Sequence, residues 1–590
     1  MPAMHRFVVA ILVLGLAWQA PAATGPIVWV SKKPSGAATL DANAGTVSAD
    51  GHWAAFSTDE PLVTADTNGK RDIYLKSLDD GALPLVSHAA GGQNGGNGIS
   101  DPASDPNNYF AIDLSVDGRF VVYDSQATDL VTGITDANAG EDVFRFDRLT
   151  GTNEVVSLQD ATHTRAQTSV NPHTSGDGQM IVFGSDLKVW VRDMQNGTTT
   201  RADVSITGGE PDNFAERPDI SADGGFVAFI SPATNLVTGD GNGVSDVFRR
   251  DLVANQTARV SVADDESEAA DASNHPHISG DGAKVVFDSS ADNLIGASAD
   301  TNAAPDVFLR DVDAGTTTRI SIADDEGQAT LGGRHPDVSA DGTRVSFDTT
   351  QDNLGDPSLS NLGVQDVFVR GRVGGTTVLA SVAPPGTQPI DADAELAAIC
   401  GSGRFVAFRT RTTRLDSTDS GAVQDIYAKD LGPGNDTTAP TVTLDGLVAT
   451  VATDPSGIAM VLIDGQIVRL PADRQVAVPP GMTIEVWDGA ANHQTATAPQ
   501  PQPQVGVTID RTKLRRKRLQ VTFTVTTAPA DGTIEIHRIR KKSDKIVASQ
   551  TFTQAVDQQT VTVTKRLARG RYAVTITAAG QTVSASFRVH

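Results

Sequence analysis

Four stretches of the chain carry the same oxygen-bearing side chains at the same spacing. Each has Asp, Asn and Asp at offsets 0, 2 and 6. The four sets are Asp66, Asn68 and Asp72; Asp136, Asn138 and Asp142; Asp240, Asn242 and Asp246; and Asp300, Asn302 and Asp306. Carboxylate and amide oxygens on alternate residues of a turning loop are suitable ligands for a hard cation. The pattern therefore predicts Ca²⁺ binding in these loops.

The same residues also permit an interpretation without metal. Asp and Asn form tight turns by bonding their own backbone. The Glu that completes an EF-hand loop at its twelfth position is missing from all four stretches. The last Asp of each set could instead bond backbone groups where the next strand begins. Both interpretations stay open on the sequence alone.

Four histidines precede the glycine turns of three repeats, namely His173, His275, His277 and His335. If the strand that carries them lines a central channel, they could converge there on a metal ion. Their positions differ between repeats, and we identify no carboxylate that recurs beside them. A scattered set of this kind lacks metal-ligand spacing, so we expect exposed polar residues at a rim.

Motifs for nucleophilic or hydrolytic catalysis are missing from the sequence. It contains no Gly-x-Ser-x-Gly elbow, no His-Glu-x-x-His pair and no phosphate-binding glycine loop. The single cysteine, Cys400, stands where a sister repeat has Ser221, which indicates a small packing residue. One cysteine cannot form an intrachain disulfide, so the cores must hold the fold together.

The elements that must position these residues come from a long internal repeat. A small residue pair, a Gly turn and an apolar strand recur seven times, with the turn glycines at Gly51, Gly118, Gly178, Gly224, Gly282, Gly342 and Gly403. After a loop, a third strand begins Asp-Val-Phe or Asp-Ile-Tyr in six copies, and a fourth strand follows a tight turn. Four antiparallel strands joined in this way form one propeller blade.

The fourth type of strand follows only six of the seven copies. After Asp425 the chain runs into Gly432-Pro433-Gly434, whereas Ile27–Ser31 matches the missing strand. We therefore predict an all-β fold in which residues 25–434 form a seven-bladed β-propeller closed by its N-terminal strand, which removes exposed edges. The third blade should be shortened, because Ser185–Lys188 replaces the long loop.

The repeat resembles that of the TolB-type, WD-repeat-like bacterial propellers. Ser48-Ala49-Asp50-Gly51 with Asp72-Ile73-Tyr74 carries the likeness, and so does Ser339-Ala340-Asp341-Gly342 with Asp366-Val367-Phe368. The resemblance covers about residues 25–432. It implies the fold but not the activity, because propellers serve many unrelated functions.

The segments outside the repeats predict export and two further domains. Residues 1–22 fit a signal peptide, with an apolar run over Phe7–Trp18 and a cleavage pattern at Ala20-Pro21-Ala22. We therefore expect a secreted or periplasmic protein without a membrane span. Residues 436–498, with Asp454-Pro455-Ser456-Gly457 and Trp487-Asp488-Gly489, resemble a bacterial immunoglobulin-like module. Residues 499–505 should be a stiff Pro/Gln linker.

Residues 506–590 alternate apolar and polar side chains, which predicts a second small β-sandwich. Residues 501–590 hold 16 Lys and Arg against 5 Asp and Glu, although the whole chain has a net charge of −25. The basic residues could contact an anionic envelope polymer, or they could merely protect strand edges. Nucleic acid is not expected, because no aromatic residues stand among these charges.

Together these patterns predict an exported, monomeric, non-catalytic binding or scaffold protein. Loops between the second and third strands, and the links between blades, are long and polar, and both should lie on one face. We expect that face to recognise an extracellular or envelope protein or glycan. The alternative is a propeller-fold enzyme, a polysaccharide lyase or hydrolase, with a metal near the central channel.

Overall fold

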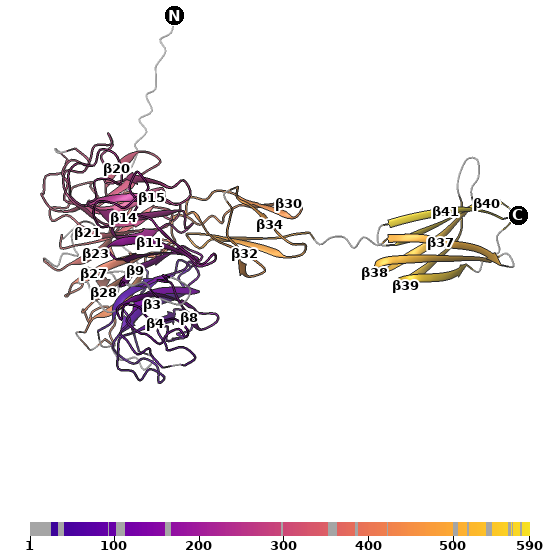
Figure 1. Ribbon diagram of the computed structural model, residues 1–590, viewed down its shortest axis with the longest axis horizontal. Coiled ribbons are helices and arrows are strands. Elements are labelled where there is room, and N and C mark those ends of the chain that lie inside the picture. Colours follow the sequence, from indigo (N-terminus) through magenta and orange to yellow (C-terminus); the bar gives the residue numbers. More distant parts are fainter. Residues whose placement is uncertain are drawn as a thin grey trace, which may run out of the picture. The chain divides into compact units, whose positions relative to one another are not determined.

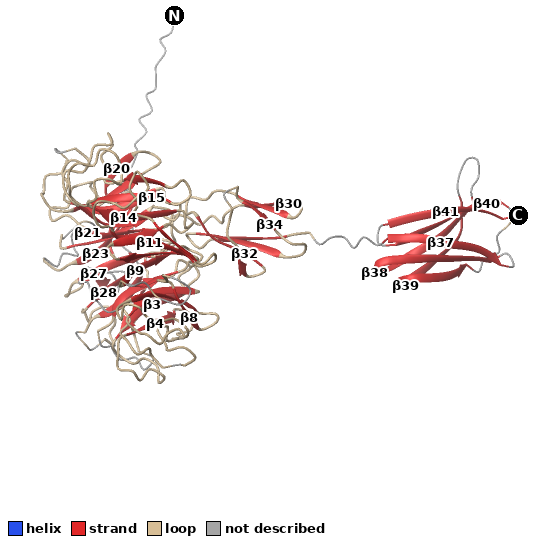
Figure 2. Ribbon diagram, in the orientation of Figure 1, coloured by secondary structure: helices blue, strands red, loops and turns tan. Residues whose placement is uncertain are grey.

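The computed structural model describes residues 25–589 with gaps, and all its regular elements are strands (Figure 2). Outside the described residues lie 1–24, 34–40, 93, 102–111, 160–163, 165–166, 297–298, 352–353, 355–362, 384–387, 420, 422, 472, 500–505, 516–517, 539–544, 564–567, 569, 579–580 and 590. The predicted signal peptide and residues 500–505 of the predicted linker are therefore outside them. Among the described residues, a helix capable of crossing a membrane is not found.

The chain divides into two compact units. The first contains residues 1–477 and 483–496, and the second contains residues 478–482 and 497–590. Each is described by itself below. Figure 1 labels the strands.

The first unit is built mainly from small antiparallel sheets that follow one another along the chain. The first three are β2 (Asn43–Val47), β3 (Trp53–Thr58) and β4 (Asp72–Ser77); β5 (Ile112–Leu114), β6 (Phe120–Ser125), β7 (Asp142–Asp147) and β8 (Thr152–Val155); and β9 (Ser169–Thr174), β10 (Met180–Ser185), β11 (Lys188–Asp193) and β12 (Thr198–Arg201). In the first sheet, Leu85 forms an isolated bridge to Tyr74 in place of a fourth strand.

The remaining repeat sheets have four strands each. They are β13 (Glu216–Ile220), β14 (Phe226–Ser231), β15 (Asp246–Asp251) and β16 (Gln256–Arg259); β17 (Ser273–Ile278), β18 (Lys284–Ser289), β19 (Asp306–Asp311) and β20 (Thr316–Arg319); β21 (Arg334–Val338), β22 (Arg344–Thr349), β23 (Asp366–Gly371) and β24 (Thr376–Leu379); and β27 (Ala394–Ile399), β28 (Phe405–Thr410), β29 (Asp425–Asp430) and β1 (Ile27–Trp29). A short hairpin of β25 (Val382–Ala383) and β26 (Gln388–Pro389) stands beside them.

The hydrophobic cores of this unit lie between neighbouring sheets. One cluster, for example, joins Val182 and Val191 of the β9–β12 sheet to Val227, Phe229 and Phe248 of the β13–β16 sheet. The sheets therefore pack face to face in sequence order, each burying apolar side chains on both sides. This is the arrangement of a β-propeller, and it bears out the all-β prediction.

The recurring Ser-x-Asp-Gly motif forms the turn between the first and second strand of a sheet. In one copy the Ser221 hydroxyl donates to Asp223 at 2.6 Å, and the backbone N–H of Phe226 donates to Ser221 at 3.0 Å. Gly224 has φ +69°, a left-handed conformation that glycine adopts at little cost. Neighbouring turns are joined by backbone bonds such as Gly280 N–H to Ala340 O at 2.9 Å.

A buried latch fixes the fourth strand to the third. The Ser261 hydroxyl donates to Asp246 Oδ1 at 2.5 Å and accepts the backbone N–H of Val247 at 3.1 Å. The same Asp–Ser pair recurs as Asp72–Ser87, Asp142–Ser157, Asp306–Ser321 and Asp366–Ser381. In the β9–β12 sheet, whose loop between the second and third strands is short, Asp203 replaces the serine and accepts the backbone N–H of Val189 at 2.9 Å.

The last repeat sheet takes its latch serine from the opposite end of the chain. Strand β1 pairs antiparallel with β29, with Trp29 opposite Tyr427. Ser31 donates to Asp425 Oδ1 at 2.6 Å and accepts the N–H of Ile426 at 3.0 Å, and the Trp29 indole donates to Asp425 at 2.9 Å. These bonds reproduce the latch of the internal repeats.

The module that follows the repeats contains two small sheets, as a sandwich requires. They are β30 (Val442–Asp445), β31 (Val448–Val451) and β34 (Gln475–Ala477), and β33 (Gln466–Ile467), β32 (Ile458–Ile463), β35 (Thr483–Asp488) and β36 (His493–Thr497). We call residues 436–498 the module. Its relation to immunoglobulin-like domains stays a prediction.

The second unit is a five-stranded antiparallel sheet. Its strands are β37 (Gly506–Arg515), β38 (Arg518–Arg538), β39 (Lys545–Val563), β40 (Gly570–Ala578) and β41 (Gln581–Val589). The long β38 pairs with β37, β39 and β40. The alternating sequence pattern thus corresponds to strands, whereas the predicted sandwich stays untested.

Replacing the latch serine of β1 should destabilise the protein as much as replacing an internal one. Ser31→Ala leaves the Ile426 N–H and an Asp425 oxygen without their hydroxyl partner, which should cost about 1–3 kcal/mol of unfolding free energy. Ser321→Ala is the matched internal variant. Denaturant unfolding of the two variants measures this, and a silent Ser31→Ala beside a destabilising Ser321→Ala would contradict it.

Candidate functional site

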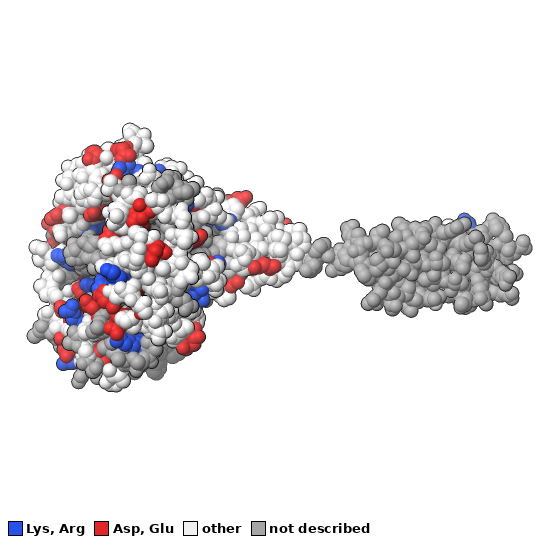
Figure 3. Space-filling model, turned by 60° about the horizontal axis from the view of Figure 1, so that its bottom comes forward, with Lys and Arg blue, Asp and Glu red and all other residues white. Residues whose placement is uncertain are grey.

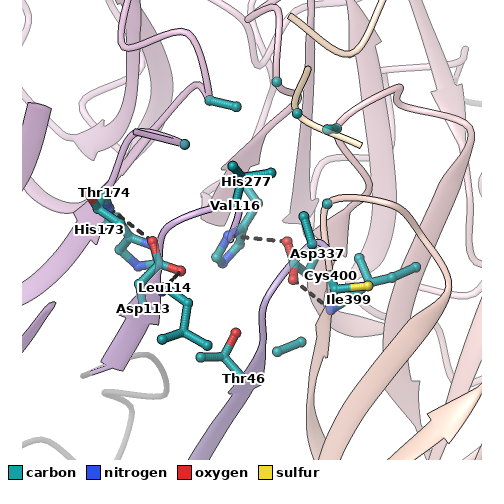
Figure 4. A pocket seen from close by; sticks show the side chains of 18 of the residues that line it. Thr46, Asp113, Leu114, Val116, His173, Thr174, His277, Asp337, Ile399 and Cys400 are labelled. Carbon is teal, nitrogen blue, oxygen red and sulfur yellow. Dashed lines mark hydrogen bonds and ion pairs between the residues drawn. The ribbon is translucent and has the colours of Figure 1, made fainter. Parts of the chain in front are cut away.

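The innermost strands of the repeat sheets line one central cavity of about 140 Å³ (Figure 4). One position of the repeat, five residues before the turn glycine, faces it in every copy. The residues at this position are Thr46, Asp113, His173, Asp219, His277, Asp337 and Ala398. Five consecutive copies therefore alternate between a carboxylate and an imidazole. We call Asp113, His173, Asp219, His277 and Asp337 the channel ring.

Each imidazole of the channel ring lies between two carboxylates. His173 Nδ1 is 3.3 Å from Asp219 Oδ1 and 3.8 Å from Asp113 Oδ2. His277 Nδ1 is 3.3 Å from Asp219 Oδ2 and 3.5 Å from Asp337 Oδ1. The two imidazoles meet edge to face at 5.7 Å between ring centroids. Asp219 is thus shared by both histidines.

The carboxylates of the channel ring also join neighbouring sheets. Asp113 accepts the backbone N–H of Thr174 at 2.9 Å, and Asp219 accepts that of Ile278 at 2.9 Å. Asp337 accepts the N–H of Ile399 at 2.8 Å. Each bond crosses from one inner strand to the next, so the ring fixes the spacing of the sheets around the cavity.

Burial and mutual attraction set the protonation of the ring. Although burial works against its charged form, Asp337 and Asp219 raise the pKa of His277 to about 9. Burial raises the pKa of Asp337 to about 6, against the opposing effect of His277. Burial also opposes ionisation of Asp219, but His173 and His277 outweigh it and lower that pKa. At neutral pH the ring therefore holds a buried, charge-paired imidazolium.

A second pair of histidines, His275 and His335, lies two residues before the ring residues His277 and Asp337. His275 is 2.6 Å from Asp288, His335 is 2.9 Å from Asp348, and the two imidazoles are 4.6 Å apart. Both have left-handed backbones, with φ 49° and 48°. The equivalent residues Asn171, Arg217 and Leu396 share this conformation, which marks a bulge common to the inner strands.

The expectation that the four histidines are exposed at a rim is wrong. His173 and His277 are 9% and 7% exposed, and the side chains of His275 and His335 are 16% and 14% exposed. The expectation that the histidine positions differ between repeats is wrong as well, because His173 and His277 stand at the same distance from their turn glycines. The ring is missed when repeated histidines and repeated carboxylates are sought separately. Counting back from each turn glycine shows the alternation, because one repeat position carries either residue type.

The module closes one end of the cavity, where the Ser-x-Asp-Gly turns meet. Gly489 lines the cavity, and Ala459 and Met460 pack in one cluster with Ala49 and Val116 of the turns. The approach is close: a Cβ at Gly280 would collide with the Ser456 carbonyl oxygen. Small residues at the turns therefore make room for the loops of the module. This contact was not predicted from the sequence.

The predicted calcium loops lie on the opposite face, among loops that are hydrogen-bonded to one another. In all four, the Asn side chain donates to the last Asp and to a carbonyl of the following link. For Asn242 these bonds are 3.2 Å to Asp246 and 2.9 Å to the oxygen of Ala269, and its own oxygen accepts Val244 N–H at 3.0 Å. The sister bonds run from Asn68 to Gly96, from Asn138 to Gln167 and from Asn302 to Ala329.

Three of the described links are in turn bonded to the next loop. The Asn97 side chain donates to Thr128, Thr234 donates to Asp212, and Asn293 donates to the oxygen of Glu268, all at 2.6–2.8 Å. We call the loops between second and third strands, together with the links between sheets, the loop crown. Its members are braced from both sides, which corresponds to the turn interpretation of the Asp and Asn residues. Calcium binding by them stays a prediction.

Two of the four predicted loops hold an arginine between their aspartates. Arg259 Nη1 is 3.6 Å from Asp240, 3.7 Å from Asp246 and 2.5 Å from Glu268. Arg319 Nη1 lies 3.9 Å from Asp300 and 3.5 Å from Asp306. A cation is thus accommodated between these carboxylates, and it is a guanidinium.

The module contributes a further acidic group that the sequence analysis did not single out. One carboxylate oxygen from each of Asp436, Asp454 and Asp488 lies within 4.8 Å of the others. Burial, together with Asp454 and Asp436, raises the pKa of Asp488 to about 7. Asp454 and Asp488 belong to the turns that suggested the immunoglobulin-like resemblance, so a signal was present without its chemical meaning.

No protein-family model and no curated protein matches this chain. Among solved structures, TolB from Agrobacterium tumefaciens is 14% identical, covering 59% of this chain and 86% of that one with a TM-score of 0.30. The WD40 repeats of RRP9 are 11% identical, covering 70% of this chain and 99% of that one, with a TM-score of 0.36. A prolyl endopeptidase is 10% identical, covering 83% of this chain and 55% of that one, with a TM-score of 0.39.

The chain therefore spans about half the length of that endopeptidase. These likenesses concern the fold alone. They do not indicate what the chain does, because proteins with unrelated functions share this fold.

The channel ring should make stability depend on alkaline pH. The pKa of His277 is raised from about 6.5 to about 9, so the stability it contributes is complete below 6.5 and disappears as pH rises through 9. We expect a loss of up to about 3 kcal/mol across this window. Thermal melts at pH 6.5 and 9 measure it.

His277→Gln should flatten this pH dependence, whereas His52→Gln, at an exposed histidine, should keep it. A His277→Gln protein with the wild-type slope between pH 6.5 and 9 would contradict the role assigned to the ring.

The fit of the module at the cavity mouth should depend on glycine at position 280. Gly280→Val places a side chain against the Ser456 carbonyl and should displace the module, so that cleavage of residues 432–440 by added protease becomes about tenfold faster. Gly241→Val is the control, because a Cβ there meets nothing within 4 Å. Equal cleavage of both variants would argue against the contact.

Proposed function

We propose that this is an exported, non-catalytic binding or scaffold protein whose loop crown recognises an envelope or extracellular protein or glycan. In this proposal the repeat sheets are seven blades of one ring, which β1 closes by completing the last blade. The observation that carries the proposal is the bracing of the crown, in which the loops before β7, β15 and β19 are hydrogen-bonded to the links before and after them.

A braced crown supports recognition because it reduces the entropy lost on binding. Loops fixed before the ligand arrives lose less conformational freedom than mobile ones. The module already covers the other end of the central cavity, so the crown is the face left for a partner. Figure 3 shows acidic and basic side chains interspersed over one face of the first unit.

Two exposed apolar side chains on the crown are suited to anchor such a partner. Ile206 and Leu331 are 60% and 56% exposed, and both lie in links between sheets. Their backbone N–H groups donate to Asn235 O and to Gln351, at 2.9 Å and 3.1 Å, which fixes their positions. Exposed apolar residues with a polar surround are common at the centres of binding surfaces.

The test is binding of the full chain to an array of bacterial polysaccharides and purified envelope proteins. We expect retention of at least one of them, and Ile206→Ser with Leu331→Ser should weaken it about tenfold. Val253→Ser with Val373→Ser is the matched control, because both valines are 75% exposed but lie in turns on the opposite face.

The rival function, a lyase or hydrolase acting at the channel, predicts a different result on the same array. New polysaccharide or peptide ends would appear, and His277→Gln would abolish them. Equal weakening by the crown and turn variants would also contradict recognition by the crown.

A further inference from the structure

A groove of about 560 Å³ opens between the module and the turns of the β9–β12 and β13–β16 sheets. The module contributes the start of β32 and residues 468–471, and the turns contribute residues 177–180 and 223–225. None of the residues that line the groove also lines the central cavity. Clefts of about 300–1,000 Å³ at junctions between structural units are common binding sites.

One wall of the groove is an open strand edge. Strand β35 pairs with β32 along its length, whereas β33 pairs only with Leu462 and Ile463. The Val468 N–H then donates to Val461 O at 2.8 Å, and the chain leaves β32 for the other sheet of the module. Among the described strands, none pairs with Ile458–Met460 on this side, and these residues line the groove. An unpaired edge is a template for an added strand.

Apolar side chains stand on both sides of this edge. Met180 from the turns and Val468 and Leu470 from the module line the groove, and each is partly exposed. The unbranched side chain of methionine adapts to neighbours of different shape. When a peptide adds to a sheet edge, main-chain hydrogen bonds supply affinity, and pockets for alternate side chains supply selectivity.

The groove has a surplus of negative charge. Three aspartates line it against two arginines. The Arg469 guanidinium pairs with Asp193 at 2.6 Å, and that of Arg474 donates to two backbone carbonyls of the module. The surplus therefore lies at the other two aspartates, Asp177 and Asp223.

These two aspartates belong to neighbouring Ser-x-Asp-Gly turns, which are joined by a bond from Gly176 N–H to Ala222 O at 2.8 Å. Each uses Oδ1 for its own turn, where it accepts a serine hydroxyl at 2.6 Å and a backbone N–H at 2.9 Å. Neither turn requires the second oxygen, so a ligand can use it. Burial raises the pKa of both carboxyls, and a positive charge beside them would favour their ionised form.

We propose that this groove binds an extended peptide segment of a partner protein, which adds to the open edge of β32 and places a lysine beside Asp177 and Asp223. The lysine stem would lie along the apolar walls while its ammonium reaches the carboxylates. A glycan could bond the carboxylates but would make no use of a strand edge, so the groove favours a peptide. The groove lies on the turn side of the repeat unit, so the proposal is independent of what the loop crown recognises.

The experiment measures binding of the full chain to a labelled peptide, Val-Thr-Val-Lys-Val-Thr-Val with blocked ends, by fluorescence anisotropy. We expect saturable binding, and the peptide with Glu in place of Lys should bind about tenfold more weakly. An analogue methylated on all its backbone nitrogens cannot donate to the strand edge and should not bind.

Two pairs of variants locate the site. Gln195→Trp places a bulky ring in the groove and should weaken binding at least about tenfold. Val373→Trp puts the same ring at the equivalent position of the β23–β24 turn, outside the groove, and should bind as the wild type does. Asp223→Asn keeps the acceptor of its turn and should weaken binding of the lysine peptide, whereas Asp117→Asn, in a turn outside the groove, should not.

The proposal is overturned if the wild type does not bind the lysine peptide or binds the methylated analogue equally well. Equal weakening by Gln195→Trp and Val373→Trp, both folded by circular dichroism, also overturns it. Binding of soluble cellotetraose or chitotetraose that Gln195→Trp abolishes, without peptide binding, would assign the groove to a glycan instead. Ile206→Ser on the loop crown should leave peptide binding unchanged, which separates the two sites.

Discussion

The bond between the first aspartate of a third strand and a serine of the fourth is the interaction on which the rest of the repeat unit depends. The serine hydroxyl donates to the buried carboxylate and accepts the next backbone N–H, so the third and fourth strands are fixed to each other at the edge of the crown. In the last sheet this bond joins residues 394 positions apart. A local motif thereby becomes a long-range constraint that orders the N-terminal strand.

The same constraint explains where charge is buried. The latch places an aspartate beneath the long loops, and in four sheets a tyrosine or an arginine compensates a second acid beside it. In the channel ring, imidazoles alternate with the buried carboxylates and compensate their charge. Buried acids thus join strands to strands and sheets to sheets, and their counter-groups decide how pH acts on the protein.

How much of this the sequence predicts depends on how local the cause is. The turn at Gly224 and the strands on either side follow from Ser221, Asp223 and apolar alternation, so the all-β repeat could be predicted. The structural interpretation of the last Asp was also available, since Asp246 sits at a strand start. The guanidinium of Arg259 reaches Asp240 from another strand, and that contact could not be foreseen without pairing the strands.

Two other features depended on contacts that no motif carries. The channel ring becomes visible only when His277 and Asp219 are recognised as the same repeat position. The contact between the module and the turns depends on small residues such as Gly280. This glycine matters because the Ser456 carbonyl approaches it closely, not because of its own conformation. Sequence patterns predict local conformation well, but they do not predict contacts between segments that are far apart in the chain.

The account is tested most directly by hydrogen exchange of the backbone amides in β1, measured by mass spectrometry on the full chain. Because Ser31 and Asp425 place β1 inside the last sheet, peptides covering residues 25–33 should be as protected as those covering β29. Asp425→Ala should remove the protection of β1 while the β17–β20 sheet keeps its own. Rapid exchange of β1 in the wild-type protein would contradict the latch as the bond that completes the fold.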